Sequence, residues 1–468
     1  MYKVSKTVIS RTKYKDLYGY LETFGRLACA LRNAAVFRMR QHITASGKEN
    51  LSGNEKLVRD EIQLTVKTKN TKQPKFLMSY CFMDKLMRVT HNPDFFNGLP
   101  MQTSQEVLKQ VVRDFKSWAE SCKKYKTDPS GFTGRPVMPG YKKHDSVVSY
   151  VITNQDCVIY KKNNSSWMKF PKTDITMPIG YMPDKGRLMQ VEVKKVYDDF
   201  VVLCVFDVPD DSTATHCFLH ECGIDFGVNN IIALVSSSLD CLLYKGGMLK
   251  AENQFYNKQL AYYRSVAAQG HDTREAVKLG LLTTKRMQQI NKKHHYRIHD
   301  MLHKISSDVI RYCVSNSIGI IVMGVNKYWK QESNIGHVNN QNFVQMPVCT
   351  LRKMITYKAE QAGIIVREQE ESYTSRADLI IGDDIPVCSK EKHTAYKFSG
   401  LRIKRGLYRS GNGMIVNADL NAAGNILRKN IPSVFNNVTD WTFMQKIKVR
   451  KFSDLCNKST PVKGIEAW

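Results

Sequence analysis

Acidic side chains stand at three separated points of this 468-residue sequence where their chemistry suits a divalent metal. Asp225 follows a short apolar stretch in "GIDFGVNN", Asp419 lies in "NADLNAAGN", and the segment "REQEES" carries Glu370 and Glu371. Magnesium prefers oxygen ligands, and metal-assisted cleavage of a phosphodiester needs several carboxylates. An aspartate shortly before a glycine also fits ordinary turn chemistry, so the surrounding elements must decide between the two interpretations of Asp225.

The elements expected around Asp225 are those of an α/β unit. Strands are predicted at "ECGIDF", "NNIIALVSS" and "CLLYKGG", followed by a long helix at about 284–316 with one apolar face. A buried strand "IGIIVMG", a helix ending at Gly363, a strand "GIIVREQEE" and a helix over 417–427 complete the order. This is the order of an RNase H-like fold, in which the parallel strands are buried on both faces and have continuous apolar sequences.

In that order Asp225 ends the central strand and Asp419 begins the last helix, so the two carboxylates can meet around Mg²⁺, and two ions are expected. A third acid belongs at the end of the fourth strand, which has Gly324 there instead. Because neighbouring strands lie about 4.8 Å apart, a glutamate of the next strand can extend into that space. Glu371 is the first candidate and Glu370 the alternative, since adjacent side chains point to opposite faces. A solvated acidic loop is the competing interpretation.

Charge and composition limit the class of protein. Lys plus Arg number 70 against 43 Asp plus Glu, and this net charge of +27 points to a polyanion such as nucleic acid as partner. Apolar runs such as "FVVLCVFDV" are too short to span a bilayer, and the N-terminus lacks a signal peptide's apolar core. We therefore expect a cytoplasmic protein without a membrane partner. No two of the 12 cysteines have the spacing of a zinc ribbon.

The first half of the chain predicts two further parts. Apolar residues at helical spacing and arginines on the opposite face predict a basic helical domain over 11–127. A Gly- and Pro-rich stretch then leads into strands up to residue 217, which together with a first strand in 1–10 predict a small β-barrel. Lysines and aromatic residues alternate in "YKKNNSSWMKFPK". That pattern fits a surface that tracks a nucleic-acid backbone, and a purely structural barrel accounts for it equally well.

Six motifs, in this order along the chain, resemble the transposon-encoded TnpB proteins and the compact type V CRISPR effectors: "GIDFGVNN", "MGVNKYWKQ", "NNQNFVQMP", "EESYTSRAD", "FSGLRIKRGLYRS" and "NADLNAAGNIL". The similarity is close over about 219–428 and weaker before it. It implies a helical recognition domain inserted in a β-barrel wedge domain, followed by a RuvC-type nuclease. It also implies a guide RNA, a short flanking DNA motif read by the protein, and cleavage of DNA at one RuvC site with Mg²⁺, or Mn²⁺ as a substitute. Asp225 and Asp419 match the family's first and last catalytic acids.

Two departures limit what the resemblance implies. Most members have a glutamate where this chain has Gly324, although a branch that resembles this sequence carries the acid in the "EESYTS" segment. Most members also carry a zinc ribbon, whereas residues 376–412 have Cys388 as their only cysteine, so no zinc is expected. The basic residues expected to contact nucleic acid are Lys330, Arg402, Lys404, Arg405 and Arg409.

The predicted function is an RNA-guided DNA endonuclease whose partners are a guide RNA and target DNA, as duplex and as RNA–DNA heteroduplex. An RNA-guided DNA-binding repressor with an inactive site is the alternative, and a transposase that acts without RNA is a third. The expected parts are a first wedge strand (1–10), a recognition domain (11–127), the remaining wedge (128–217), the first nuclease part with a helical insertion (218–375), a target-nucleic-acid-binding segment (376–412), the last nuclease part (413–430) and a basic C-terminal segment (431–468).

Overall fold

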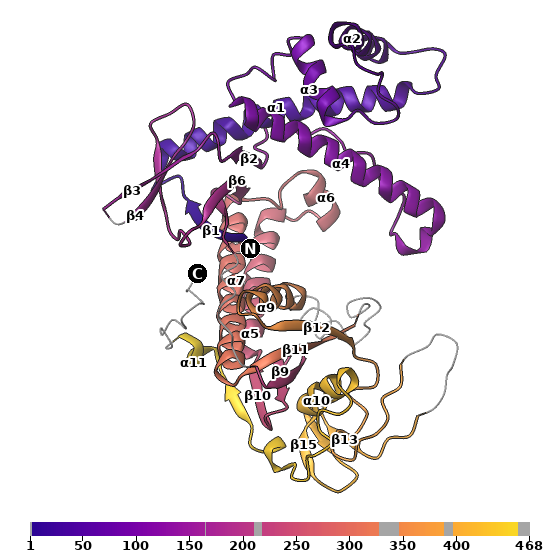
Figure 1. Cartoon of the computed structure of the whole chain (residues 1–468), viewed down its shortest axis with the longest axis vertical. Coiled ribbons are helices and arrows are strands. Elements are labelled where there is room, and N and C mark those ends of the chain that lie inside the picture. The colour runs from indigo at the N-terminus through magenta and orange to yellow at the C-terminus, as the bar shows by residue number, and fades with distance from the viewer. Residues whose placement is uncertain (1, 164, 210–217, 327–345, 388–395, 457–468) are drawn as a thin grey trace. The chain divides into compact units, whose positions relative to one another are not determined.

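A computed structural model describes residues 2–163, 165–209, 218–326, 346–387 and 396–456 (Figure 1). The chain divides into two units, Met1–Asp211 and Ser212–Trp468, and each combines helices with sheets. The fold is therefore mixed α+β and multidomain, as the sequence predicts. None of the described helices has both the length and the apolar character that crossing a bilayer requires.

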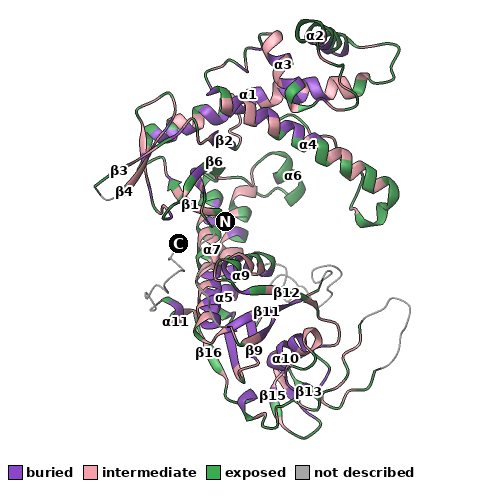
Figure 2. Ribbon diagram, in the orientation of Figure 1, coloured by how far each residue is buried: buried purple, intermediate pink, exposed green. Residues whose placement is uncertain are grey.

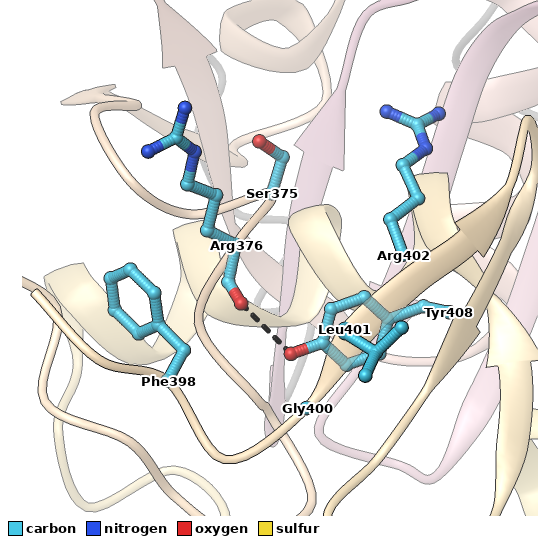
Figure 3. Close-up of a pocket in the computed structure, with 7 residues that line it drawn as sticks. All are labelled: Ser375, Arg376, Phe398, Gly400, Leu401, Arg402 and Tyr408. Carbon is cyan, nitrogen blue, oxygen red and sulfur yellow. Dashed lines mark hydrogen bonds between the residues drawn. The ribbon is translucent and has the colours of Figure 1, made fainter.

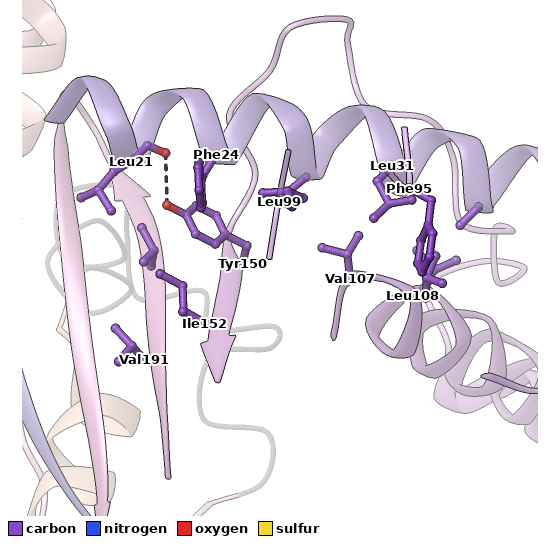
Figure 4. Packing of buried hydrophobic residues seen from close by; sticks show 14 of the residues in the cluster. Leu21, Phe24, Leu31, Phe95, Leu99, Val107, Leu108, Tyr150, Ile152 and Val191 are labelled. Carbon is purple, nitrogen blue, oxygen red and sulfur yellow. Dashed lines mark hydrogen bonds between the residues drawn. The ribbon is translucent and has the colours of Figure 1, made fainter. Parts of the chain in front are cut away.

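Helices fill the early part of the first unit: α1 Lys15–Ala45, α2 Gly53–Lys69, α3 Tyr80–Val89 and α4 Met101–Thr127. The apolar positions of α1 recur every three or four residues and are buried, among them Leu21 and Phe24. Figure 4 shows Tyr150 packed beneath this face, where its hydroxyl donates a hydrogen bond of 3.3 Å to the carbonyl of Leu21. The helices and the strand that follows them thus share one core.

Strands of the first unit form two sheets. The larger has the order β1-β7-β6-β2, with β1 Tyr2–Ile9, β7 Asp199–Asp207, β6 Arg187–Val196 and β2 Tyr150–Thr153. The smaller joins β3 Val158–Lys162, β4 Ser165–Lys169 and β5 Thr176–Ile179. The first strand pairs antiparallel with β7 along its whole length, from Tyr2 with Asp207 to Ile9 with Phe200.

The predicted single barrel is not what these strands build. Between the described strands, hydrogen bonding leaves two open sheets, and residues of both, such as Val191 and Met177, pack in one core. Pro178 in β5 explains one open edge, because proline lacks the N–H that a continuing ladder needs.

The second unit is organised around a sheet of order β12-β11-β8-β9-β10-β16. Its strands are β8 His220–Asp225, β9 Asn230–Ser236, β10 Asp240–Lys245, β11 Ile318–Val325, β12 Ile365–Glu370 and β16 Lys448–Arg450. Strands β8, β9 and β10 are antiparallel neighbours, whereas β11 runs parallel to both β8 and β12. The carboxyl ends of β8, β11 and β12 consequently lie at the same edge of the sheet, with β11 in the middle.

Helices cover both faces of this sheet. Alternate residues of β9 point to opposite cores: Leu234 packs with residues of α7 Lys285–Ser315 and α9 Val348–Gln361, and Val235 packs with α10 Ala418–Asn430. The remaining helices are α5 Gly247–Ala268, α6 Thr273–Lys278 and α11 Phe452–Cys456. Strand β9 is buried throughout, and β8 and β11 are buried over most of their middle (Figure 2), which explains their continuous apolar sequence.

A small antiparallel sheet is formed by the part of the sequence that follows β12 and precedes α10. It has the order β13-β14-β15, with β13 Leu401–Lys404, β14 Leu407–Arg409 and β15 Ile415–Asn417. Because β15 ends at the residue before α10, this sheet is directly joined to the helix that carries Asp419.

Candidate active site

Asp225 is the last residue of β8, at the edge where the three parallel strands end. Helix α10 packs directly on this strand. The approach is so close that an added β-carbon at Gly223 would collide with the main chain at Ala423. Only glycine allows an approach this close. The consequence is that Asp419, in the first turn of α10, lies near enough to Asp225 to raise the pKa of its carboxyl.

Glu371 reaches the same place from the other side of β11. It follows the last residue of β12, whose register pairs Gln369 with Gly324. A β-carbon added to Gly324 would stand 2.9 Å from Oε2 of Glu371 and 2.7 Å from Cδ1 of Ile426. The space that a side chain of the fourth strand would occupy is therefore bounded by the carboxylate of Glu371 and the end of the Ile426 side chain.

Glu370, the alternative acid, points elsewhere. Its carboxylate forms an ion pair of 2.8 Å with Lys429 of α10 and accepts a hydrogen bond of 2.7 Å from the amide of Ser372. Burial opposes ionisation, but the hydrogen bonds from Lys429 and Ser372 outweigh it and lower the pKa of Glu370. The two adjacent glutamates thus take different places, as strand alternation predicts.

Asp419 is held by contacts that the sequence did not reveal. Asn417 caps α10 by accepting hydrogen bonds from the amides of Asp419 and Leu420, at 2.9 Å and 3.3 Å. Buried Asn230, the first residue of β9, donates a hydrogen bond of 2.7 Å to Oδ2 of Asp419 and accepts one of 2.9 Å from Lys245. This relay fixes the orientation of the carboxylate. Its only signal in the sequence is that Asn230 lies close after Asp225.

Asp225 experiences the charges of both other carboxylates. Burial raises the pKa of Asp225 well above its usual range, and the charges of Glu371 and Asp419 raise it further, against a backbone hydrogen bond at Phe226 and the charge of Arg402. Burial also raises the pKa of Glu371. Within the described part of the chain, no three His, Cys, Asp or Glu side chains are grouped closely enough to hold a metal ion as they stand.

A cavity of about 350 Å³ is lined in part by Arg402, whose charge lowers the pKa of Asp225. Its lining comes from the segment after Glu371 and from the small sheet: Ser375, Arg376, Phe398, Gly400, Leu401, Arg402 and Tyr408. Figure 3 shows the guanidinium groups of Arg376 and Arg402 extending in the same direction, above the hydrogen bond of 2.8 Å that the Tyr408 hydroxyl donates to the Arg376 carbonyl. The cavity therefore combines cations with an aromatic wall, which suits a nucleotide.

The predicted nucleic-acid contacts have different outcomes. Arg402, Lys404, Arg405 and Arg409 are all exposed on the hairpin of β13 and β14, and Arg402 is near enough to Asp225 to lower its pKa. Lys330 and Cys388 lie outside the described residues.

Comparison with known proteins places these residues in two family models. A probable transposase model, OrfB_IS605, matches residues 204–330, and a Cas12f1-like TNB domain model matches residues 349–426. The first range contains Asp225 and Gly324, and the second contains Glu371 and Asp419. The TnpB-like protein ORF457 of Acidianus two-tailed virus is 27% identical over 248 residues, which cover 52% of this chain and 47% of the relative. The match thus spans about half of that relative's length.

Solved structures give weaker similarity. A Cas12f1-sgRNA-target DNA complex has a TM-score of 0.48 and 14% identity over 87% of this chain and 82% of that one. Alicyclobacillus acidoterrestris C2c1 in complex with single-guide RNA has a TM-score of 0.39 and 9% identity, over 91% and 88% of the two chains. The two family models and the viral relative carry the assignment: over the regions that they match, the chain is related to the TnpB and Cas12f1-like proteins.

Proposed function

We propose that this protein is an RNA-guided endonuclease that recognises a short flanking DNA motif and cleaves target DNA at a single site formed by Asp225, Glu371 and Asp419. One observation carries the proposal. The carboxylate of Glu371 occupies the space over Gly324 and, with Asp419, raises the pKa of Asp225. A decayed site would have no reason to keep a third acid in a position where its charge disfavours ionisation of Asp225.

The donor set fits Mg²⁺, with Mn²⁺ as a substitute. Carboxylate oxygens are the ligands these ions prefer, and a divalent cation would relieve the repulsion that raises the pKa of Asp225. Asp225, Glu371 and Asp419 would hold the metal after drawing together. The bound ions would supply an activated water and would stabilise charge on the scissile phosphate.

The protein's own groups orient and grip the substrate. Asn230 keeps Oδ2 of Asp419 in place, and Arg402 presents a cation beside Asp225, where a phosphate must lie to be cleaved. The exposed cations Lys404, Arg405 and Arg409 would hold the strand that enters. Phosphate contacts of this kind position nucleic acid without reading its sequence, which pairing with the guide would supply.

The parts of the chain take roles that the sheet order supports. Three antiparallel strands followed by parallel β11 and β12 support the assignment of 218–375 and 413–430 to an RNase H-like, RuvC-type nuclease domain. Residues 376–412 would bind target strand, 11–127 would form the recognition domain, 1–10 and 128–217 the wedge, and 431–468 a basic C-terminal segment. The natural place of action is the cytosol or nucleoid of a prokaryote.

Cleavage of a matched plasmid tests the proposal. The protein is purified with its copurifying RNA, that RNA is sequenced, and a supercoiled plasmid with the matching target is incubated with Mg²⁺. We expect nicked or linear DNA with the native protein and with Glu370→Gln, and intact plasmid with Glu371→Gln. Binding without cleavage by the native protein would indicate the repressor instead, and cleavage that survives RNase treatment would indicate a transposase that needs no RNA.

A further inference from the structure

We propose that helix α10, which carries Asp419, also positions Glu371 through a row of three side chains, Asn421, Asn425 and Lys429. This inference rests on the proposed function, because it assigns roles toward the same acidic site. The three residues are spaced by four, so they lie on one face of the helix. They hold the segment 371–378, which we call the glutamate loop.

The two asparagines bind main-chain groups of this loop and of Leu379 directly after it. Nδ2 of Asn425 donates hydrogen bonds to the carbonyls of Thr374, at 2.9 Å, and Ala377, at 2.7 Å. Nδ2 of Asn421 donates to the carbonyl of Ala377 at 2.8 Å, and its Oδ1 accepts from the amide of Leu379 at 3.1 Å. Both asparagines are fully buried. Buried amides with this many partners are specific connectors, since a lost partner leaves another polar group unpaired away from water.

Lys429 extends the row to the start of the loop. Besides its ion pair with Glu370, its ammonium donates to the carbonyl of Ser372 at 3.0 Å. The side chain of Glu370 and the carbonyl of Ser372, on either side of Glu371, are therefore both tied to Lys429 of α10.

The loop itself is shaped to bring these contacts to Glu371. Tyr373 has a φ of +63°, a left-handed conformation that a tyrosine adopts only when its surroundings impose it. The buried hydroxyl of Thr374 then donates a hydrogen bond of 2.9 Å to the carbonyl of Glu371. A chain of contacts thus leads from Asn425 through Thr374 to the backbone of Glu371.

Strand β12 alone does not provide this support. Among the described strands it lies at the edge of its sheet, with β11 as its one neighbour; four of its six residues are exposed, and it ends at Glu370. Attachment to α10 makes Glu371 and Asp419 parts of one rigid element. A third acid moved from the fourth strand to a loop keeps a fixed position only because this row of side chains replaces the sheet as its support.

A double-mutant cycle on metal binding tests the inference. Binding of Mn²⁺ to the guide-loaded protein is followed by electron paramagnetic resonance in native protein, Asn425→Leu, Glu371→Gln and the double variant. Residues that orient metal ligands are commonly worth 10- to 100-fold in affinity, so we expect Asn425→Leu to weaken Mn²⁺ binding by about tenfold. In the Glu371→Gln background the same change should alter affinity by less than about twofold, since it acts through Glu371.

Two further variants separate positioning from general stability. Thr374→Val keeps the shape of the side chain and removes only the hydroxyl, and we expect it to weaken Mn²⁺ binding by a few-fold, about threefold or more. Asn430→Ala is the matched control, because Asn430 bonds Gln369 of β12 at 3.1 Å and leaves the glutamate loop untouched, so its Mn²⁺ affinity should be native.

The outcomes distinguish a failure of the positioning role of α10 from a failure of the proposed nuclease site. An equal loss from Asn425→Leu with and without Glu371 would overturn the positioning role while leaving the nuclease intact. Native Mn²⁺ binding by folded Thr374→Val would overturn it too, and this variant decides the question where Asn425→Leu does not fold. If Glu371→Gln binds Mn²⁺ and cleaves DNA like native protein, the proposed site itself is wrong.

Discussion

The carboxylate of Glu371 lies 2.9 Å from the point where a side chain on Gly324 would begin. The two positions compete for one space, so the glycine and the displaced acid depend on each other. Gly324→Ala should lower the free energy of unfolding by about 1–3 kcal/mol, the usual cost of overpacking. Gly247→Ala, where an added β-carbon meets nothing within 4 Å, is the control and should not be destabilised. Thermal unfolding measures both.

The same competition predicts a functional exchange. The double change of Gly324→Glu with Glu371→Gly returns the acid to the fourth strand and removes the carboxylate that would clash with it. The end of the flexible Ile426 side chain must also shift. Relative to Glu371→Gly alone, we expect at least about tenfold faster plasmid cleavage. No gain from a folded double variant would mean that the two positions do not serve one site.

Asp225→Asn should separate stability from activity. The pKa of Asp225 is raised by burial and by two neighbouring carboxylates, so its charge is unfavourable without metal. A neutral amide of the same shape should stabilise metal-free protein by about 1–2 kcal/mol at neutral pH. Cleavage should fall by more than about 100-fold, since even groups that only orient metal ligands are worth 10- to 100-fold. Unfolding in EDTA measures the stability without metal, and plasmid cleavage measures the activity. A destabilised variant would contradict the repulsion between Asp225 and its neighbouring carboxylates.

Asn230→Ser should disturb the site without removing an acid. The shorter side chain cannot join Lys245 to Oδ2 of Asp419, which are 2.9 Å and 2.7 Å from the amide. We expect cleavage to slow by about 10- to 100-fold, with partial recovery at high Mg²⁺, because the carboxylate loses orientation rather than charge. Lys245→Met should show a smaller loss in the same direction. A defect that excess metal does not reduce would argue against the relay.

The exposed hairpin of β13 and β14 should contribute salt-dependent affinity. Replacing Lys404 and Arg405 by alanine removes two exposed cations. If both contact phosphates of a single strand, the slope of log K against log salt should become shallower by about 1.4 in total, at about 0.7 for each contact. Lys404→Arg with Arg405→Lys keeps the charges and is the control. Fluorescence anisotropy with single-stranded DNA across a salt series measures the slope, which stays native if the hairpin does not bind.

Lys358 should make stability depend on pH. It is buried, donates hydrogen bonds of 2.7 Å to the hydroxyls of Ser306 and Ser307, and burial lowers its pKa from 10.5 to about 7. Between those values the unfolded chain binds a proton that the folded protein lacks, so stability rises with pH there and is lowest below pH 7. From pH 7 to 9, native protein should gain up to about 1.4 kcal/mol per pH unit relative to Lys358→Met. If the free energies of unfolding of native protein and Lys358→Met change with pH in the same way, this role of Lys358 is disproved.

The sequence by itself predicted strands β8 to β12 and helices α7, α9 and α10 of the second unit, but not strands β13 to β16. Apolar periodicity is local, so the strand ending at Asp225, the long helix α7 and the helix that begins with Asp419 could be read directly. Alternation along β12 also favoured Glu371 over Glu370, because side-chain direction follows from the strand period.

Only the tertiary structure decided how distant groups meet. That Glu371 fills the space over Gly324, that Asn230 orients Asp419, and that the first unit's strands form two open sheets depend on contacts between residues far apart in sequence. The four-residue spacing of Asn421, Asn425 and Lys429 is visible in the sequence, yet a polar row on a helix ordinarily faces water. In the folded protein the glutamate loop packs over this row and uses its hydrogen bonds. Only the tertiary structure shows this role, because packing, unlike periodicity, is a property of the folded chain.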